Sequence, residues 1–256
     1  MSKSILFLLF YFYFTSIISG QTDSKIIKVS YVGTPISQYQ FSVNDSRPQD
    51  YRQSVVDLMQ GYKYYYTLYV NPKTNQSLYK FEKLLVKKPK GQEKTNLQLN
   101  DELAYCIKTN SKNYYKFETL FEREFYSIGS MEDIEWEITN EKKVMLGFEC
   151  TKAVAKNKNY LISVWFTDKI PVSSGPANYF GLPGLVIWAE DFFRTTQIEK
   201  IEYISEKQFP LAEEIKKIKV TFDKNKKSSE IQEKLFLEKK SSLVKSMMKH
   251  MNESVK

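Results

Sequence analysis

Three carboxylates flank a glycine- and proline-rich turn, and they are the side chains best placed for acid–base chemistry. Asp168 precedes the turn, and Glu190 and Asp191 follow it. Two carboxyl groups that face each other across a sugar bond are the requirement of a glycoside hydrolase. The competing interpretation is conformational, because an Asp beside a turn commonly accepts hydrogen bonds from nearby backbone. We favour a protein without catalytic residues and keep a hydrolase as the alternative.

Nucleophilic and metal chemistry have little support in the sequence. His250 is the only histidine, so Ser-His-Asp catalysis, Cys-His catalysis and multi-histidine zinc sites lack candidates. Thioether and imidazole ligands suit copper(I), and His250 stands among Met247, Met248 and Met251. Methionines at helical spacing are more typical of a packing face. We therefore predict neither a metal site nor a cofactor.

Residues 1–20 are typical of a secretory signal peptide. Lys3 supplies the positive start, residues 5–14 the apolar centre, and small residues approach a cleavage point near Gly20. Later apolar stretches are shorter than the roughly 20 residues that a membrane span requires. We expect a mature protein that begins near Gln21 and works in the periplasm or outside the cell, where nucleic acid is not a partner.

The chain has two cysteines, Cys106 and Cys150. An even count in an exported protein favours one disulfide. Spacing alone does not establish that the two Cα atoms come within bonding reach. Two buried free thiols that behave as small hydrophobic side chains remain the alternative.

The turn at residues 181–185, Gly-Leu-Pro-Gly-Leu, requires one particular backbone path. Glycine accepts a positive φ or a close approach of other atoms, and proline fixes φ and lacks a backbone donor. We expect Gly181 and Gly184 to occupy such positions, and Leu182 and Leu185 to be buried against a sheet.

Short strand patterns precede and follow this turn. The candidates are 26–32, 62–70, 77–81, 104–108, 114–118, 134–138, 143–148, 151–154, 160–166, 195–205 and 217–222. We expect a short helix or insert near 51–61, a bulge at Gly147 and a rigid loop at 171–176. Seventeen Phe and eighteen Tyr suit a β-rich core. The predicted fold is mainly β (α+β), a curved antiparallel sheet or partly open barrel forming one domain over 21–222.

The positive charge lies near the C-terminus. Residues 216–256 carry twelve lysines against five acidic residues. Apolar residues recur at helical spacings over 228–256, with a slip near Ser241 that allows two shorter helices. We predict a basic amphipathic helical tail at 223–256, separable from the body. It is either a solvated helix face or a contact with an anionic envelope surface. Residues 87–94 form a charged, mostly basic loop, which can be a contact site, although exposed turn chemistry explains it without one.

An ordered set of short motifs resembles the GLPGLI family of exported Bacteroidetes proteins. The residues that carry the resemblance are Trp136, Gly147, Cys150, Trp165, Pro171, Gly175, Pro176, Gly181, Leu182, Pro183, Gly184 and Leu185. Order and spacing agree over roughly residues 26–205, and an ordered set is more specific than a single short match. The resemblance implies an exported, mostly antiparallel β protein from a family often encoded beside TonB-dependent outer-membrane receptors. It brings no catalytic residues.

Two positions depart from the family pattern. Residues 177–179 are Ala-Asn-Tyr, where the family tends to place an aromatic and a basic residue, and Val186 replaces an isoleucine. The first departure puts in doubt a role for a cation beside the loop. The resulting prediction is a non-enzymatic envelope protein that binds an apolar ligand, a peptide or an outer-membrane receptor, with an envelope hydrolase using Asp168, Glu190 and Asp191 as the alternative.

Overall fold

The computed structural model describes residues 25–37, 47–95, 101–109, 112–120, 122–226 and 229–253. The expected signal peptide, residues 1–20, lies outside these ranges. Across the described ranges, no helix combines the length and the apolar character needed to cross a membrane.

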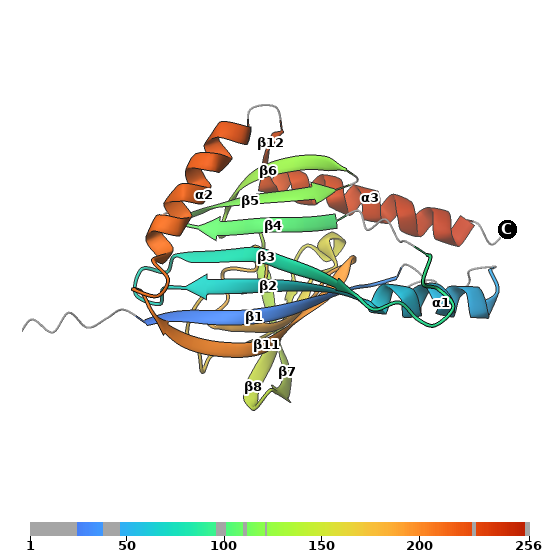
Figure 1. Cartoon of the computed structure of the whole chain (residues 1–256), viewed down its shortest axis with the longest axis horizontal. Coiled ribbons are helices and arrows are strands. Elements are labelled where there is room, and N and C mark those ends of the chain that lie inside the picture. The colour runs from blue at the N-terminus through green and yellow to red at the C-terminus, as the bar shows by residue number, and fades with distance from the viewer. Residues whose placement is uncertain are drawn as a thin grey trace, which may run out of the picture.

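Twelve strands of the described residues form one open, curved sheet (Figure 1), which confirms the predicted fold class. Their order is β12-β6-β5-β4-β3-β2-β1-β11-β10-β9-β8-β7. The bounds are β1 (Lys25–Pro35), β2 (Tyr62–Val70), β3 (Ser77–Val86), β4 (Asp101–Lys108), β5 (Asn113–Leu120), β6 (Arg123–Ser130), β7 (Trp136–Met145), β8 (Phe148–Ala155), β9 (Ser163–Thr167), β10 (Leu185–Glu190), β11 (Arg194–Ser205) and β12 (Glu230–Gln232). Neighbours are antiparallel except β12, which runs parallel to β6.

Alternate residues of the central strands enter two separate cores. The inner core lies inside the curl of the sheet, and the outer core lies on the opposite face. On β2, Leu68 belongs to the inner core and Tyr69 to the outer core; on β4, Cys106 and Ile107 repeat this division. Successive side chains of a strand point to opposite faces of the sheet. Both faces of the central sheet are therefore buried, the inner one by the curl of the sheet itself.

Helix α2 (Leu211–Asn225) covers the outer face. Leu211 and Ile215 join the outer core, and the Phe222 ring meets Tyr115 and Tyr126 edge-on at 5.4 Å. The predicted strand at 217–222 is therefore wrong. Its lysines alternate with apolar residues, which mimics a strand, but Ile215 and Phe222 share one helix face and pack on the sheet.

Helix α3 (Glu233–Glu253) is a single helix, continuous through Ser241. Glu233 and Phe236 are buried, and Ser241 Oγ donates to the carbonyl of Asn159, 2.9 Å away. The prediction of a helix is correct for residues 233–253. The prediction that this tail is separable from the body is not supported, because Glu233 and Phe236 of the helix are buried against the rest of the chain. Its charge lies on the exposed side, at Lys234, Lys239, Lys245 and Lys249.

The β7–β8 hairpin turns through Leu146 and Gly147, which have φ values of 51° and 80°. Positive φ at both central residues is the type I′ geometry that suits a two-residue hairpin. The predicted bulge at Gly147 is therefore wrong, and the predicted strand 143–148 is divided between β7 and β8. The turn carries Leu146 into solvent.

Two further helical segments complete the fold. Helix α1 (Gln49–Gln60) lies at the end of β1 and β2 (Figure 1), and its Leu58 side chain is buried. A short 3-10 helix, η2 (Lys158–Tyr160), precedes β9 and contacts α3. The α1 segment agrees with the expected helix near 51–61.

Candidate binding site

The Gly-Leu-Pro-Gly-Leu turn has the backbone that its sequence predicts. Gly181 has φ +90°, and its N–H donates to Ser173 Oγ at 2.8 Å. A Cβ at Gly184 would lie 1.9 Å from the carbonyl oxygen of Thr167, at the end of β9. Leu182 and Leu185 are both buried. The turn is thus an architectural joint between the preceding loop and β10.

Two further motif residues, Trp136 and Gly175, hold this loop in place. Trp136 Nε1 donates to the Phe180 carbonyl at 2.7 Å. A Cβ at Gly175 would come within 2.6 Å of Val186 Cβ, and Pro176 is buried beside it. Trp165 lies opposite Trp188 in the β9–β10 pair. Pro171 is exposed and stands at the start of the loop.

Lys108 on β4 ties the loop to the inner face of the sheet. Its ammonium donates to Asn75 Oδ1 at 2.8 Å, the Ser173 carbonyl at 2.7 Å and Ser174 Oγ at 3.2 Å. It also lies 4.9 Å from the centre of the Phe180 ring. Burial lowers the pKa of Lys108 to about 8. The acceptors around it stabilise the charged form, so the loop and the β2–β3 turn together supply the partners that this buried lysine needs.

A buried charge triad joins α3 to β5. Lys116 Nζ lies 2.9 Å from Glu118 Oε1 and 2.6 Å from Glu233 Oε1, and all three side chains are at most 5% exposed. Burial raises the pKa of Glu233. The pKa of Lys116 is raised, although burial alone would lower it, because two carboxylates flank it. Asn178 Nδ2 bridges the triad to the loop by donating to Glu233 at 3.3 Å and to the Tyr114 hydroxyl at 2.9 Å.

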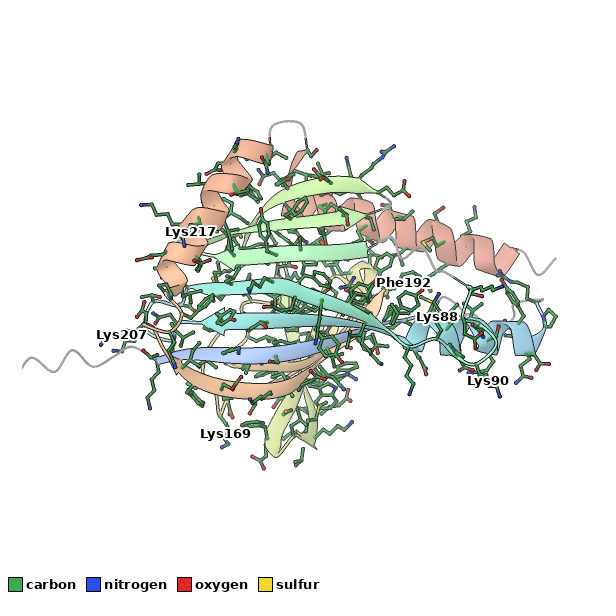
Figure 2. The ribbon with its side chains drawn as sticks, viewed as in Figure 1. Lys88, Lys90, Lys169, Phe192, Lys207 and Lys217 are labelled. Carbon is green, nitrogen blue, oxygen red and sulfur yellow. The ribbon has the colours of Figure 1, made fainter. Side chains whose placement is uncertain are left out.

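A cavity of about 70 Å³ remains beneath α3. Lys116 and Glu118 supply polar lining, and Leu103 of β4, Phe192 of the β10–β11 turn and Val244 of α3 supply apolar lining. A water molecule needs roughly 10–15 Å³ of such volume, so the space holds on the order of five water-sized groups. Figure 2 labels Phe192 at the end of the strands where α1 also lies.

The candidate carboxylates do not form one site. Asp168 is exposed just after β9, whose last residue pairs with Leu185, whereas Glu190 ends β10. At about 3.3 Å per residue, the two lie roughly 16 Å apart along the strand, beyond the roughly 9.5 Å upper limit for a glycosidase pair. Burial and the neighbouring Asp191 raise the pKa of Glu190.

Asp191 has a conformational role. Its Oδ1 accepts the N–H groups of Phe193 at 2.7 Å and Arg194 at 2.9 Å, and its Oδ2 accepts the Tyr179 hydroxyl at 3.1 Å. These bonds hold the turn between β10 and β11, as the conformational interpretation expects.

Cys106 and Cys150 are buried free thiols, so the expected disulfide is not formed. Six strands separate β4 from β8 in the sheet, and neither thiol meets the other. Burial raises the pKa of both thiols. They behave as small core side chains, which was the alternative interpretation.

The described residues contain no cluster of three or more His, Cys, Asp or Glu side chains able to hold a metal ion. The copper(I) site considered at Met247, Met248, His250 and Met251 stays untested, since the side chains of His250 and Met251 are not among those described.

Sequence reasoning did not single out the buried polar residues Lys108, Lys116, Glu118, Asn178 and Glu233. One signal was present, because Tyr114, Lys116 and Glu118 alternate on one face of β5 with aromatic residues on the other. An alternating strand is normally taken to expose its polar face. Here the polar face lies inward, under α3 and the loop.

Comparison with known proteins gives a short family match. Residues 155–188 match the family model described as "Protein of unknown function (Porph_ging)". The match covers β9, the loop, the turn and most of β10. A comparison with curated proteins finds no match.

Among solved structures, two crystal forms of PNGF-II are similar to this chain, in space groups P21 and C2. They share 15% and 16% sequence identity with it, each at a TM-score of 0.42 over 71% of this chain. The chain spans only 29% and 28% of their lengths. An uncharacterized conserved protein from Thermus thermophilus shares 8% identity at a TM-score of 0.33, over 73% of this chain and 85% of its own. At such low TM-scores we draw no argument from these likenesses.

Proposed function

We propose that this chain is an exported, non-enzymatic envelope protein of the GLPGLI family that holds an apolar group of a ligand or peptide in the cavity beneath α3. The short match to a Bacteroidetes-linked family covers the residues of the eponymous turn and so supports the family assignment. The turn and its loop act as architecture, and the cavity is the binding element.

The observation that carries the proposal is the cavity between the charge triad, Phe192 and α3. Ligand sites are typically concave and mostly apolar, with a few convergent polar groups. Leu103 and Val244 offer apolar contact, while Glu118 presents a carboxylate. A ligand would therefore place an apolar group against Leu103 and Val244 and a hydrogen-bond donor near Glu118.

The partner that delivers or receives this ligand would be an outer-membrane receptor of the TonB-dependent class. This part of the proposal rests on the family resemblance. The hydrolase alternative receives no support from the placement of its carboxylates, because Asp168 lies far from Glu190 and Asp191 is engaged in its own turn.

The test is co-purification from the native host. Native mass spectrometry of the wild type should show a bound lipid, peptide or other small molecule. Leu103→Trp, which fills the cavity, should lose it, whereas Leu235→Trp, an exposed position on α3, should keep it. Equal retention by both variants, with both folded, would place the ligand elsewhere and overturn the proposal.

A further inference from the structure

The outer end of β3 projects beyond the body of the sheet. Over the described residues, β3 pairs with β4 only from Ser77 to Lys80, and beyond Phe81 its hydrogen-bonded neighbour is β2. Figure 1 shows this end of the hairpin extending beside α1, away from the curved body. We call residues 82–95, the strand end and the loop that follows, the arm.

The arm is held by defined contacts. The Lys87 N–H donates to the Gly61 carbonyl at 2.9 Å, and a Cβ at Gly61 would lie 2.1 Å from the Lys87 carbonyl oxygen. Gln92 Nε2 donates to the Ser54 carbonyl of α1 at 3.3 Å. The arm is therefore a preformed projection supported by α1.

Three consecutive apolar residues of the arm are exposed: Leu84 at 39%, Leu85 at 48% and Val86 at 43%. The arm also contains five lysines against two glutamates. Lys83, Lys87, Lys90 and Lys94 are exposed, and Figure 2 shows Lys88 and Lys90 at this end of the molecule. Contiguous exposed apolar residues beside lysines are the combination found on surfaces that bind anionic membranes.

We propose that the arm docks the protein on an anionic phospholipid bilayer. Leu84 and Val86, which share one face of β3, enter the interface between headgroups and acyl chains, and the surrounding lysines contact the negative headgroups. A second copy of the chain fits less well, because an edge rich in lysine repels its own copy. The assignment rests on the arm alone and does not depend on a ligand in the cavity.

Vesicle sedimentation with the full chain tests this proposal. Vesicles of mixed phosphatidylglycerol and phosphatidylcholine should bind the wild type at least tenfold more tightly than pure phosphatidylcholine. Leu84→Ser with Val86→Ser, which leaves charge unchanged, should weaken binding at least tenfold, and Lys87→Glu with Lys90→Glu should do the same.

The matched control is Lys169→Glu with Lys207→Glu, which makes the same charge change at exposed positions away from the arm (Figure 2) and should change binding less than twofold. Circular dichroism confirms folding of each variant. Equal losses in the arm and control charge variants would show attraction by net charge alone and overturn the proposal. Sedimentation as a dimer that Leu84→Ser with Val86→Ser dissociates would overturn it in favour of a second copy.

Discussion

At the residue scale, Gly184 and Gly147 are required for different reasons. Gly184 is crowded, since a Cβ would overlap the Thr167 carbonyl, whereas Gly147 has φ +80° with open space around it. Gly184→Ala must displace the backbone and should cost about 3 kcal/mol or more. Gly147→Ala should cost only about 1–2 kcal/mol, the penalty of a left-handed conformation. Urea unfolding measures both, and a Gly184→Ala variant as stable as wild type would contradict the close packing.

The two thiols give a second prediction at this scale. Because Cys106 and Cys150 are buried and burial raises the pKa of each thiol, neither should react with a thiol reagent in the folded protein. Denaturation without reductant should expose both to labelling. A mass lowered by two hydrogens, together with no labelling after denaturation, would instead reveal a disulfide.

At the scale of elements, α3 is joined to the sheet by a buried charge triad of one lysine and two glutamates. Lys116 pairs with both Glu118 and Glu233, so the three groups together carry an excess of negative charge when ionised. Removing the cation leaves two buried carboxylates facing each other, while removing one carboxylate leaves a neutral pair. The lysine is therefore the member on which the attachment of α3 depends most.

Lys116→Met should destabilise the protein by about 3–5 kcal/mol at neutral pH. Glu233→Gln should cost about 1 kcal/mol, because Lys116 keeps Glu118 and a Gln oxygen still accepts a hydrogen bond. The Lys116→Met loss should shrink as the pH falls, since burial raises the pKa of Glu233 and protonation of this group removes the repulsion between the two carboxylates. Chemical unfolding of both variants across pH checks this, with Lys239→Met on the exposed side of α3 as the control. A larger cost for Glu233→Gln than for Lys116→Met would refute the assignment.

At the scale of the whole molecule, the interior is rich in buried tyrosines. Burial raises the pKa of Tyr31, Tyr79 and Tyr114. The Tyr31 hydroxyl also crosses the inner core to donate to the Val186 carbonyl at 2.7 Å. The Tyr31 hydrogen bond thus links β1 to β10 across the interior of the curled sheet.

These tyrosines predict steep alkaline unfolding. Their folded-state pKa values lie above the unfolded value of about 10, so their contribution to stability is present below that pH and is lost as the pH rises above it. Near-ultraviolet phenolate absorbance and circular dichroism should therefore change together. Tyr31→Phe should lose about 1 kcal/mol at neutral pH and show a shallower alkaline decline. Phenolate formation throughout a still-folded protein would contradict the burial.

The proposed ligand cavity and the arm belong to one end of the fold. Phe192, at the β10–β11 turn, and α1, which supports the arm, lie at the same end of the strands (Figures 1 and 2). A bilayer bound by the arm would thus lie at the end of the fold that holds Phe192, one of the residues that line the cavity. The vesicle and co-purification experiments test these two sites separately.

Local features of the fold are readable from the sequence. The β2–β3 hairpin, the helical character of α3 and the backbone demands of Gly181 and Gly184 all follow from residues close together in the chain. Side-chain period, turn chemistry and glycine conformation act over a few residues, so the sequence predicts them directly.

Only the tertiary structure decided the properties that depend on contacts between distant elements. Residues 217–222 alternate like a strand, yet packing on the outer face makes them part of α2. The alternation of Lys116 and Glu118 predicts an exposed face, yet α3 buries it and supplies Glu233 as a partner. Cys106 and Cys150 are buried free thiols on β4 and β8, a placement that an even cysteine count does not reveal. The sequence alone determined the periodicity and the turns of this protein, whereas burial and charge pairing required the packing of distant segments, since both depend on distances between residues far apart in the chain.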